Sequence, residues 1–379
     1  MDVSARVTRS RGRACIEGVR RLSWDAGEFC EFSSALVAAL ECLGQEVSYD
    51  EVNAVCGAGF RMTHCSEPWF PGAYSIRNLE PDPWGPVRRA FRWVGRECAM
   101  VQRAPLRPCF RVPEAALSPD VEVGDHGTDR ARILESLDRG VPVVAFNVVG
   151  PSDCCVIAGY DEGGDVLMGW STYQDIPDDH KEPHDSTGYF RKTGWEDNLP
   201  GYMLLGESVQ RPSWRMRTRS VLLDAVTLVR GGSDADWTRG LDAYEAWARD
   251  MENDGLFGPE YQDGPLGPYL GVAAGMVMID DRRSAACFLR QVAVTEPCLA
   301  PQAEAAAACY DRTLETKREM DRLLPGNFSP DAMRDVFDPG VRRQYAQLLR
   351  QARTSDEQAI QHVDALTKER DDDWWTSEV

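Results

Sequence analysis

The sequence predicts an α+β domain with an antiparallel sheet, followed by an all-α helical bundle. Between residues 139 and 208 the chain carries short β-rich segments separated by Gly- and Pro-containing turns. Before residue 139 most of the pattern is helical, and after residue 212 apolar residues recur at three- and four-residue spacing. Helices that precede a sheet, rather than alternate with its strands, are typical of α+β domains. We therefore expect a mixed domain over 1–212, a helical domain over 213–372 and an acidic tail over 373–379.

The first region begins with two predicted helices. The segment EFSSALVAALECL over 31–43 has apolar residues at helical spacing, and Gly44 after it is a typical C-terminal cap. A second helix is expected after Ser48, because Glu51 three residues later completes a capping box.

Two more helices are predicted before the sheet, over 84–101 and 129–140. Four β-rich segments follow, and they cover 141–149, 153–161, 164–171 and 201–208. The Glu-Gly-Gly turn between the second and third segments suits a tight hairpin, which favours antiparallel pairing.

The second region is predicted to be helical almost throughout. A last long helix is expected from Val341 to about Lys368, with several apolar residues on or near one face. These residues are Tyr345, Leu348, Ala352, Ile360, Val363 and Leu366. Amphipathic helices of this kind bury their apolar faces against one another, so we expect a bundle.

Charge and hydropathy exclude several classes of partner. The 379 residues include 61 acidic and 42 basic ones, which gives a net charge of −19. A surface this acidic repels phosphate groups, so we expect neither a nucleic-acid nor a membrane partner. No run of 18 apolar residues and no secretory signal occur, which predicts a cytoplasmic protein. The Arg-rich residues 1–21 are expected to form a frayed tail.

The twelve cysteines predict reduced thiols rather than a disulfide framework. They are scattered along the chain, several lie in apolar helical stretches, and no Cys-x-x-Cys pair is present. His64 and Cys65 are adjacent, but no second pair of ligands has zinc spacing. We therefore expect no metal and no cofactor.

Cys30 is the residue whose position points most directly to chemistry. It stands immediately before the predicted helix 31–43. Because a helix N-terminus favours negative charge, a cysteine there has a lowered pKa and more of the reactive thiolate. Glu28 and Glu31 flank Cys30 and are candidates for a local carboxylate base, although acids in a first helical turn are ordinary partners of the helix dipole.

The order of these elements resembles that of papain-like cysteine peptidases. The matching stretches are GEFCEFSSAL at 27–36, RGVPVVAFNVVGPSDCCVIAGYDEGGDVLMGWS at 139–171 and YMLLG at 202–206. The pattern looks most like the C39-like branch and the related N-terminal domain of butirosin-biosynthesis-type acyl transferases. The resemblance covers residues 14–212 and implies a papain-like fold with Cys30 as nucleophile.

The resemblance also assigns three further positions. The slot of the base histidine falls on Asp153, and the residue that orients the base falls near Trp170–Ser171. The slot of the glutamine that stabilises the oxyanion falls on Trp24. Only the nucleophile slot thus holds the residue usual in the family, and a carboxylate beside a thiol raises rather than lowers the thiol pKa.

Other residues are candidates for the base and for substrate binding. Among five histidines, His184 is preferred over His180 as a substitute base, because Asp185 beside it is able to fix its tautomer. In the Pro- and aromatic-rich loop that follows residue 58, Arg61 is a candidate for binding a carboxylate or phosphate. Trp69 is a candidate for covering an acyl or aromatic ligand.

Two functional hypotheses follow, with a third less favoured. The first is a cysteine-nucleophile hydrolase or acyl transferase, with a degenerate triad, acting on a thioester, ester or amide. The second is a catalytically inactive papain-like module, a pseudoenzyme, that binds a peptide or small ligand. The third is a structural interaction protein built around the bundle. The helical domain also offers a surface for oligomer formation.

Overall fold

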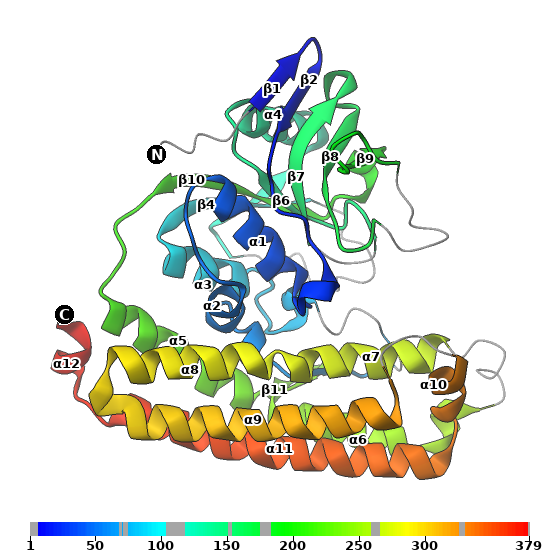
Figure 1. The fold of residues 1–379 in the computed structure, drawn as a ribbon, viewed down its shortest axis with the longest axis vertical. Coiled ribbons are helices and arrows are strands. Elements are labelled where there is room, and N and C mark those ends of the chain that lie inside the picture. Colours follow the sequence, from blue (N-terminus) through cyan, green and yellow to red (C-terminus); the bar gives the residue numbers. More distant parts are fainter. Residues whose placement is uncertain are drawn as a thin grey trace. The chain divides into compact units, whose positions relative to one another are not determined.

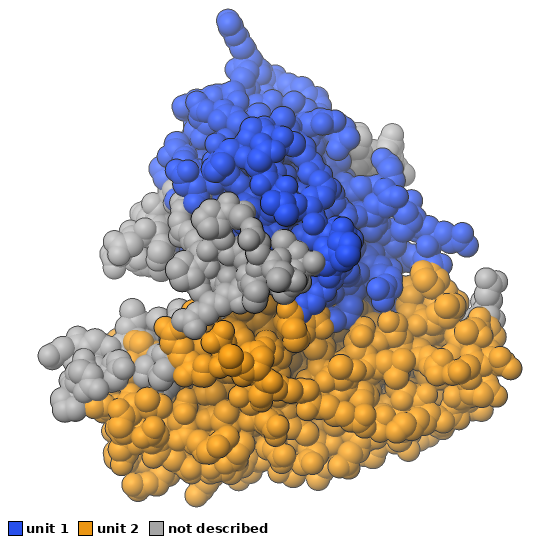
Figure 2. Space-filling model, turned by 180° about the vertical axis from the view of Figure 1, so that it is seen from behind, with its two compact units in different colours: residues 1–52, 82–211 blue, residues 53–81, 212–379 orange. Residues whose placement is uncertain are grey.

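The computed structural model describes residues 7–67, 70, 75–103, 118–150, 154–174, 183–258, 266–325 and 330–377. The chain divides into two compact units, which are coloured separately in Figure 2. Unit 1 comprises Met1–Val52 and Asp82–Arg211, and unit 2 comprises Asn53–Pro81 and Pro212–Val379. The expected boundary near residue 212 is therefore present. The segment Asn53–Pro81, however, was expected in the first domain and belongs to the helical unit.

Unit 1 is built on a nine-stranded mixed sheet with the order β1-β2-β7-β6-β10-β4-β5, in which β8 pairs with β7 and β9 (Figure 1). Its strands are β1 (Val7–Ser10), β2 (Arg13–Ile16), β4 (Arg96–Arg103), β5 (Val121–Gly124), β6 (Val143–Phe146), β7 (Cys154–Asp161), β8 (Val166–Trp170), β9 (Phe190–Thr193) and β10 (Gly201–Ser208). The four predicted segments became β6, β7, β8 and β10, and their pairings are antiparallel. The sheet as a whole is mixed, because β5 pairs parallel to β4.

Two sequence predictions in unit 1 are wrong. The N-terminal segment is not a frayed tail over residues 7–16, because β1 and β2 form a hairpin and the apolar face of β2 is buried on β7. The helix predicted over 84–101 is only α3 (Gly85–Val94). Gly95 takes a left-handed backbone with φ 67° and ends it, after which the chain extends into β4.

Helices cover the sheet of unit 1. The first is α1 (Glu31–Cys42), which packs against β6 and β7. All residues of α1 from Glu31 to Leu40 are buried, so it is a core helix rather than an amphipathic surface helix. A further helix, α4 (His126–Asp138), begins at the cap Asp125 and packs against β2, β6 and β7.

A tight hairpin joins β7 to β8, as the Glu-Gly-Gly turn predicted. Glu162, Gly163 and Gly164 have φ angles of 53°, 69° and 100°. In β8, a Cβ on Gly169 would lie 2.0 Å from the carbonyl oxygen of Val156 on β7. Only glycine fits at that position without moving a strand.

Unit 2 is a helical bundle. Its helices are α5 (Trp214–Arg230), α6 (Leu241–Glu252), α7 (Leu266–Asp280), α8 (Arg282–Thr295), α9 (Ala300–Leu323), α10 (Pro330–Asp335), α11 (Pro339–Lys368) and α12 (Asp372–Thr376). In Figure 1, α9 runs alongside α8 and α11, with which it packs. The last long helix begins two residues earlier than predicted, with Asp338 as its cap, and all six of its predicted face residues are buried.

The segment Asn53–Pro81 enters unit 2 through both backbone and side-chain contacts. It follows the start of α2 (Tyr49–Val55) and contains β3 (Thr63–Cys65). The small sheet β11-β12-β3 joins it to β11 (Gly232–Ser233) and β12 (Trp237–Arg239). Arg282 also donates to the carbonyl oxygens of Gly59 and Arg61, at 3.1 and 2.8 Å.

An ion pair, Arg282–Asp356, lies in the interior of unit 2. The two side chains are 1% and 0% exposed, and Nη2 lies 2.7 Å from Oδ2. The Tyr244 hydroxyl donates to Oδ2 at 2.7 Å, and the Thr313 hydroxyl donates to Oδ1 at 2.8 Å. The carboxylate is therefore surrounded by donors, as a buried charge requires.

The predicted acidic tail is structured as far as residue 377. Helix α12 packs against α5, and Trp375 is 1% exposed. The guanidinium of Arg215 stacks over the Trp374 ring at 4.2 Å. None of the helices in the described part of the chain is both long and apolar enough to cross a membrane.

Candidate functional site

Cys30 occupies the position from which α1 begins. It has an extended backbone (φ −90°, ψ 100°) and is the N-cap residue, but its side chain accepts no bond from the helix backbone. Its Sγ instead accepts a hydrogen bond from the Ser33 hydroxyl at 3.3 Å. The residue is only 2% exposed. The sequence therefore predicted the position of Cys30 correctly, and the structure adds a hydroxyl donor to its sulfur.

A tyrosine hydroxyl lies at the backbone of Cys30. The Cys30 N–H donates to the hydroxyl oxygen of Tyr49 at 2.9 Å. Tyr49 is the first residue of α2, and the predicted cap Ser48 accepts the Glu51 N–H at 3.1 Å. Local capping thus fixes the start of α2 and brings the phenol to Cys30. We did not identify Tyr49 from the sequence, because only the packing of α2 near α1 reveals its role.

Trp24 contributes an N–H donor in the slot that the resemblance gives to glutamine. Its indole Nε1–H donates to Glu31 Oε1 at 3.0 Å, and its ring packs edge-on against Tyr173 with centroids 4.8 Å apart. Glu31 is 4% exposed. The donor, the buried carboxylate and Cys30 are thus brought together at the start of α1.

Glu28 is held in a different way. Arg20 Nη1 lies 2.9 and 3.0 Å from its two carboxylate oxygens, and the Ser34 hydroxyl donates to Oε2 at 2.8 Å. Both of its carboxylate oxygens are therefore already occupied by a guanidinium or a hydroxyl. Of the two acids that flank Cys30, Glu31 is therefore the better candidate for a local base.

The slots assigned to the base and to its orienting residue are only partly described. Asp153 lies outside the described residues, and β7 begins at the next residue, Cys154. Trp170 donates from Nε1 to the Val19 carbonyl at 2.8 Å, and the Ser171 hydroxyl donates to the Val149 carbonyl at 3.4 Å. The side chains near the orienting slot therefore hold backbone carbonyl groups in place.

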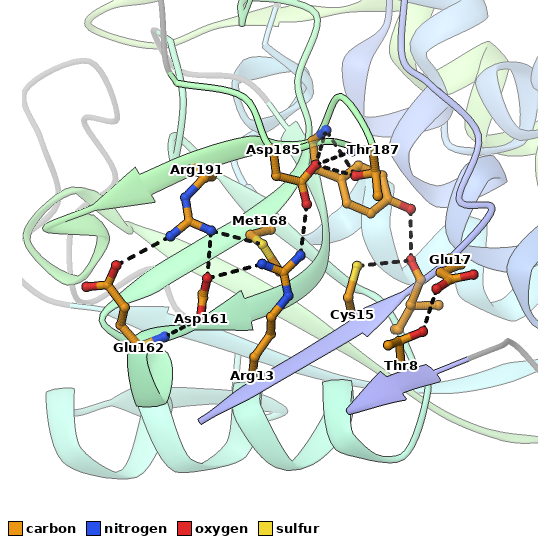
Figure 3. Close-up of polar contacts among 12 residues, drawn as sticks. Thr8, Arg13, Cys15, Glu17, Asp161, Glu162, Met168, Asp185, Thr187 and Arg191 are labelled. Carbon is orange, nitrogen blue, oxygen red and sulfur yellow. Dashed lines mark hydrogen bonds and ion pairs between the residues drawn. The ribbon is translucent and has the colours of Figure 1, made fainter. Parts of the chain in front are cut away.

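Asp185, which we expected to orient His184, also contacts residues of its own turn and of β2. His184 is exposed and forms an isolated β-bridge with Phe190. The Asp185 carboxylate accepts Arg13 Nη2 at 3.0 Å and the Thr187 N–H at 2.8 Å (Figure 3). Asp185 therefore closes its own turn and binds β2, and its role in orienting His184 stays a prediction.

Figure 3 shows a polar cluster around Asp161 that the sequence reasoning missed. Arg13 and Arg191 approach the same Asp161 oxygen at 3.1 and 2.8 Å. The hydrogen bond from Arg191 lowers the Asp161 pKa below its usual range. Asp161 belongs to the Gly-Tyr-Asp stretch at the end of β7, and its contacts tie β2 and β9 to that strand.

The other described histidines have partners of their own. His64 Nε2 lies 2.8 Å from Asp250, and His362 Nδ1 lies 2.8 Å from the Gln302 side-chain oxygen. His126 contacts Arg103. His180 lies outside the described residues. His64, His126 and His362 are therefore held by residues other than Cys30.

The two predicted ligand-binding residues of the aromatic loop have different outcomes. Arg61 belongs to unit 2, is 1% exposed and donates from Nε to Asp281 at 2.9 Å. Asn53 donates to the other Asp281 oxygen at 3.0 Å. Arg61 is therefore part of a buried ion pair rather than a surface anion site. Trp69 lies outside the described residues.

Comparisons with known proteins give no family. Neither the protein-family models nor the curated protein sequences that were compared with this chain match it. Among the residues that the structure describes, no group of three or more His, Cys, Asp or Glu side chains is arranged to hold a metal ion.

Proposed function

We propose that unit 1 is a papain-like, C39-like module in which Cys30 accepts an acyl group from a thioester and passes it to an amine or to water. The observation that carries this proposal is the hydrogen bond from the Ser33 hydroxyl to Cys30 Sγ at the N-terminus of α1. A hydroxyl donor and a helix N-terminus both stabilise the thiolate relative to the thiol. The packing of α1 on β6 and β7 gives further support.

The proposed reaction needs no separate acid to protonate the leaving thiol. The Cys30 sulfur attacks the thioester carbonyl carbon, the bond to the leaving sulfur breaks, and the Cys30 proton ends on the departing thiol. An amine or water then attacks the acyl-cysteine, and its proton returns to the Cys30 sulfur. Because a thiolate is a good leaving group, this chemistry needs little help from an imidazole, whereas peptide hydrolysis needs an acid for the leaving amine.

The contacts of Cys30 favour thioester transfer over proteolysis. His64, His126 and His362 contact residues other than Cys30. The Tyr49 hydroxyl lies at hydrogen-bond distance from the Cys30 N–H, and the Trp24 indole lies at hydrogen-bond distance from Glu31. In the proposed reaction the Tyr49 hydroxyl donates to the oxyanion that forms on the carbonyl, while the single Trp24 N–H holds Glu31 in place. Glu31, or Asp153 in the base slot, accepts the thiol proton during the attack.

A covalent adduct tests this proposal. The protein is incubated with short acyl thioesters of different chain lengths, and intact-mass and peptide mass spectrometry locate the acyl group. We expect acylation at Cys30 in the parent and in Cys15→Ala, which removes another buried thiol of unit 1, and none in Cys30→Ala. Acylation that is equal in parent and Cys30→Ala contradicts the proposal.

A second candidate function is a non-catalytic module that binds a peptide or small ligand. The observation in its favour is that Cys30 is 2% exposed and that its N–H already donates to Tyr49. A buried cysteine whose backbone N–H is already hydrogen-bonded is typical of a structural thiol. This candidate predicts no acyl adduct with any thioester. It also predicts a lower melting temperature in Cys30→Ala, because the buried thiol packs in the core and accepts the Ser33 hydroxyl.

A further inference from the structure

The last described segment of the chain folds back onto the first turns of α5. We call residues 371–377 the C-terminal strap; it consists of the cap Asp371, helix α12 and Ser377. The strap packs against α5 within unit 2, and Figure 1 shows α12 close to the start of α5. Because both elements belong to unit 2, this contact is separate from Cys30.

The two surfaces that meet here carry opposite charges. Arg215, Arg217 and Arg219 stand in the first two turns of α5, and residues 209–223 contain no aspartate or glutamate. The strap contributes three consecutive aspartates at 371–373. In a chain whose net charge is −19, the basic start of α5 is an exception, and it attracts acidic segments.

Two arginines of α5 contact both the aromatic rings and an acid of the strap. The Arg215 guanidinium lies 4.2 Å from the centroid of the Trp374 ring. Arg219 forms an ion pair with Asp372, and its guanidinium lies 5.9 Å from the centroid of the Trp375 ring. Because the two arginines are four residues apart, they lie on one face of α5. That face therefore recognises tryptophan and negative charge together.

Several features weaken the hold of α5 on the strap. Trp375 is 1% exposed, yet its indole N–H has no acceptor among the described residues, and a buried donor without an acceptor opposes docking. The Asp372 side chain is 82% exposed, so its pair with Arg219 contributes little. A helix of five residues is too short to be stable by itself, so a released strap also regains its conformational entropy. These features favour a strap that detaches.

We propose that this face of α5 is a docking surface for an acidic peptide segment that carries tryptophan, and that the C-terminal strap occupies it as a detachable built-in ligand. In the intact chain the strap is tethered, so its effective concentration is high and it excludes a free segment of similar sequence. A partner protein with such a segment binds when the strap is released. The assignment does not depend on the proposed acyl transfer at Cys30.

Fluorescence anisotropy with a labelled peptide tests this proposal. The peptide has the sequence of residues 369–379 and is titrated with the full chain, as the parent and as Trp375→Ala, in which the strap loses its buried ring. We expect the variant to bind the peptide at least about tenfold more tightly than the parent, because its own strap no longer competes. Asp371→Ala, which removes the cap of α12, is expected to give the same order. Equal or undetectable binding in the parent and in both variants overturns the proposal.

Further variants place the peptide on α5. In the Trp375→Ala background, Arg219→Gln is expected to weaken peptide binding by about threefold or more. Arg230→Gln removes the same charge from the other end of α5, where the arginine side chain is 60% exposed, and is expected to leave peptide binding unchanged. A peptide with alanine in place of both tryptophans is expected not to bind. If Arg230→Gln weakens binding as much as Arg219→Gln, or if the alanine peptide binds equally well, the attraction is general and the assignment is refuted.

Analytical ultracentrifugation separates the remaining occupant, which is the strap of a second copy of this chain. We expect the same oligomeric state in the parent and in Trp375→Ala. A dimer of the parent that Trp375→Ala abolishes means that two copies exchange their straps, and this result overturns the proposal.

Discussion

Replacing Asp356 by asparagine tests how unit 2 holds its buried charges. The change keeps the shape of the side chain but removes its negative charge, while Arg282 stays 1% exposed beside it. Arg282 retains the carbonyl oxygens of Gly59, Arg61 and Met278 as acceptors. These carbonyls accept only from Nη1, whereas Nε and Nη2 donate to Asp356 and Tyr244, so the carbonyls neither satisfy the whole guanidinium nor neutralise its charge.

The loss of stability expected for Asp356→Asn follows from these contacts. Removing one partner of a buried ion pair destabilises a protein by about 3–5 kcal/mol, because the other charge is left uncompensated. The asparagine also turns an NH₂ group toward either the Tyr244 or the Thr313 hydroxyl, both of which now donate to the carboxylate. Asp281 lies beside Arg282 in the chain and offsets part of the lost negative charge. We therefore expect Asp356→Asn to lower the free energy of unfolding by about 3 kcal/mol.

Amide hydrogen exchange on α9 and α11, measured by mass spectrometry, reports this loss within unit 2. Asp311→Asn on α9 is the matched control, since its ion pair with Arg290 is about half exposed and is expected to contribute less than about 1 kcal/mol. The double variant Arg282→Met with Asp356→Leu is expected to recover most of the stability lost in Asp356→Asn. The reasoning is refuted if Asp356→Asn costs no more than the control.

Three other perturbations have expected outcomes in unit 1. Tyr49→Phe leaves the buried Cys30 N–H without its hydroxyl acceptor and should cost about 1–3 kcal/mol in urea unfolding; an oxyanion role predicts that acyl transfer also falls by about a hundredfold. Gly169→Ala places a Cβ against the Val156 carbonyl and should lower stability by about 1–3 kcal/mol, seen as a lower melting temperature. Asp161 has a pKa lowered chiefly by its hydrogen bond from Arg191, so its stabilisation is present above about pH 4 and is lost as the pH falls through the folded-state pKa. Unfolding of parent and Asp161→Asn should therefore differ at neutral pH and converge in acid, and a difference that persists in acid contradicts this assignment.

Much of the fold was predictable because hydrophobic periodicity is local. The helices α1 and α11 and the strands β6, β7, β8 and β10 are each marked by apolar residues that lie within a few positions of one another. The hairpin β1–β2 was not predictable in this way, because β1 is a largely exposed strand, VTRS, that does not alternate apolar and polar residues. Its pairing depends on β7, more than a hundred residues later.

Long-range contacts also explain why the segment Asn53–Pro81 was expected in the first domain but belongs to unit 2. Arg61 was predicted to bind a carboxylate or phosphate because it lies in the Pro- and aromatic-rich loop, yet its partner is Asp281, 220 residues away. The position of Cys30 followed from a local helix signal. Its Tyr49 contact depends on how α1 and α2 pack, which periodicity does not specify.

The nucleophilicity of Cys30 is the central claim, and its alkylation rate measures this property most directly. The native protein is treated with iodoacetamide at neutral pH, and peptide mass spectrometry follows each cysteine with time. Cys287 is exposed on α8 and provides the internal reference for an ordinary accessible thiol. The proposed function predicts that Cys30 reacts faster than Cys287 despite its burial, because more of it is thiolate. If Cys30 reacts no faster than Cys287 and the other thiols, Cys30 is a structural cysteine and the proposed acyl transfer is wrong.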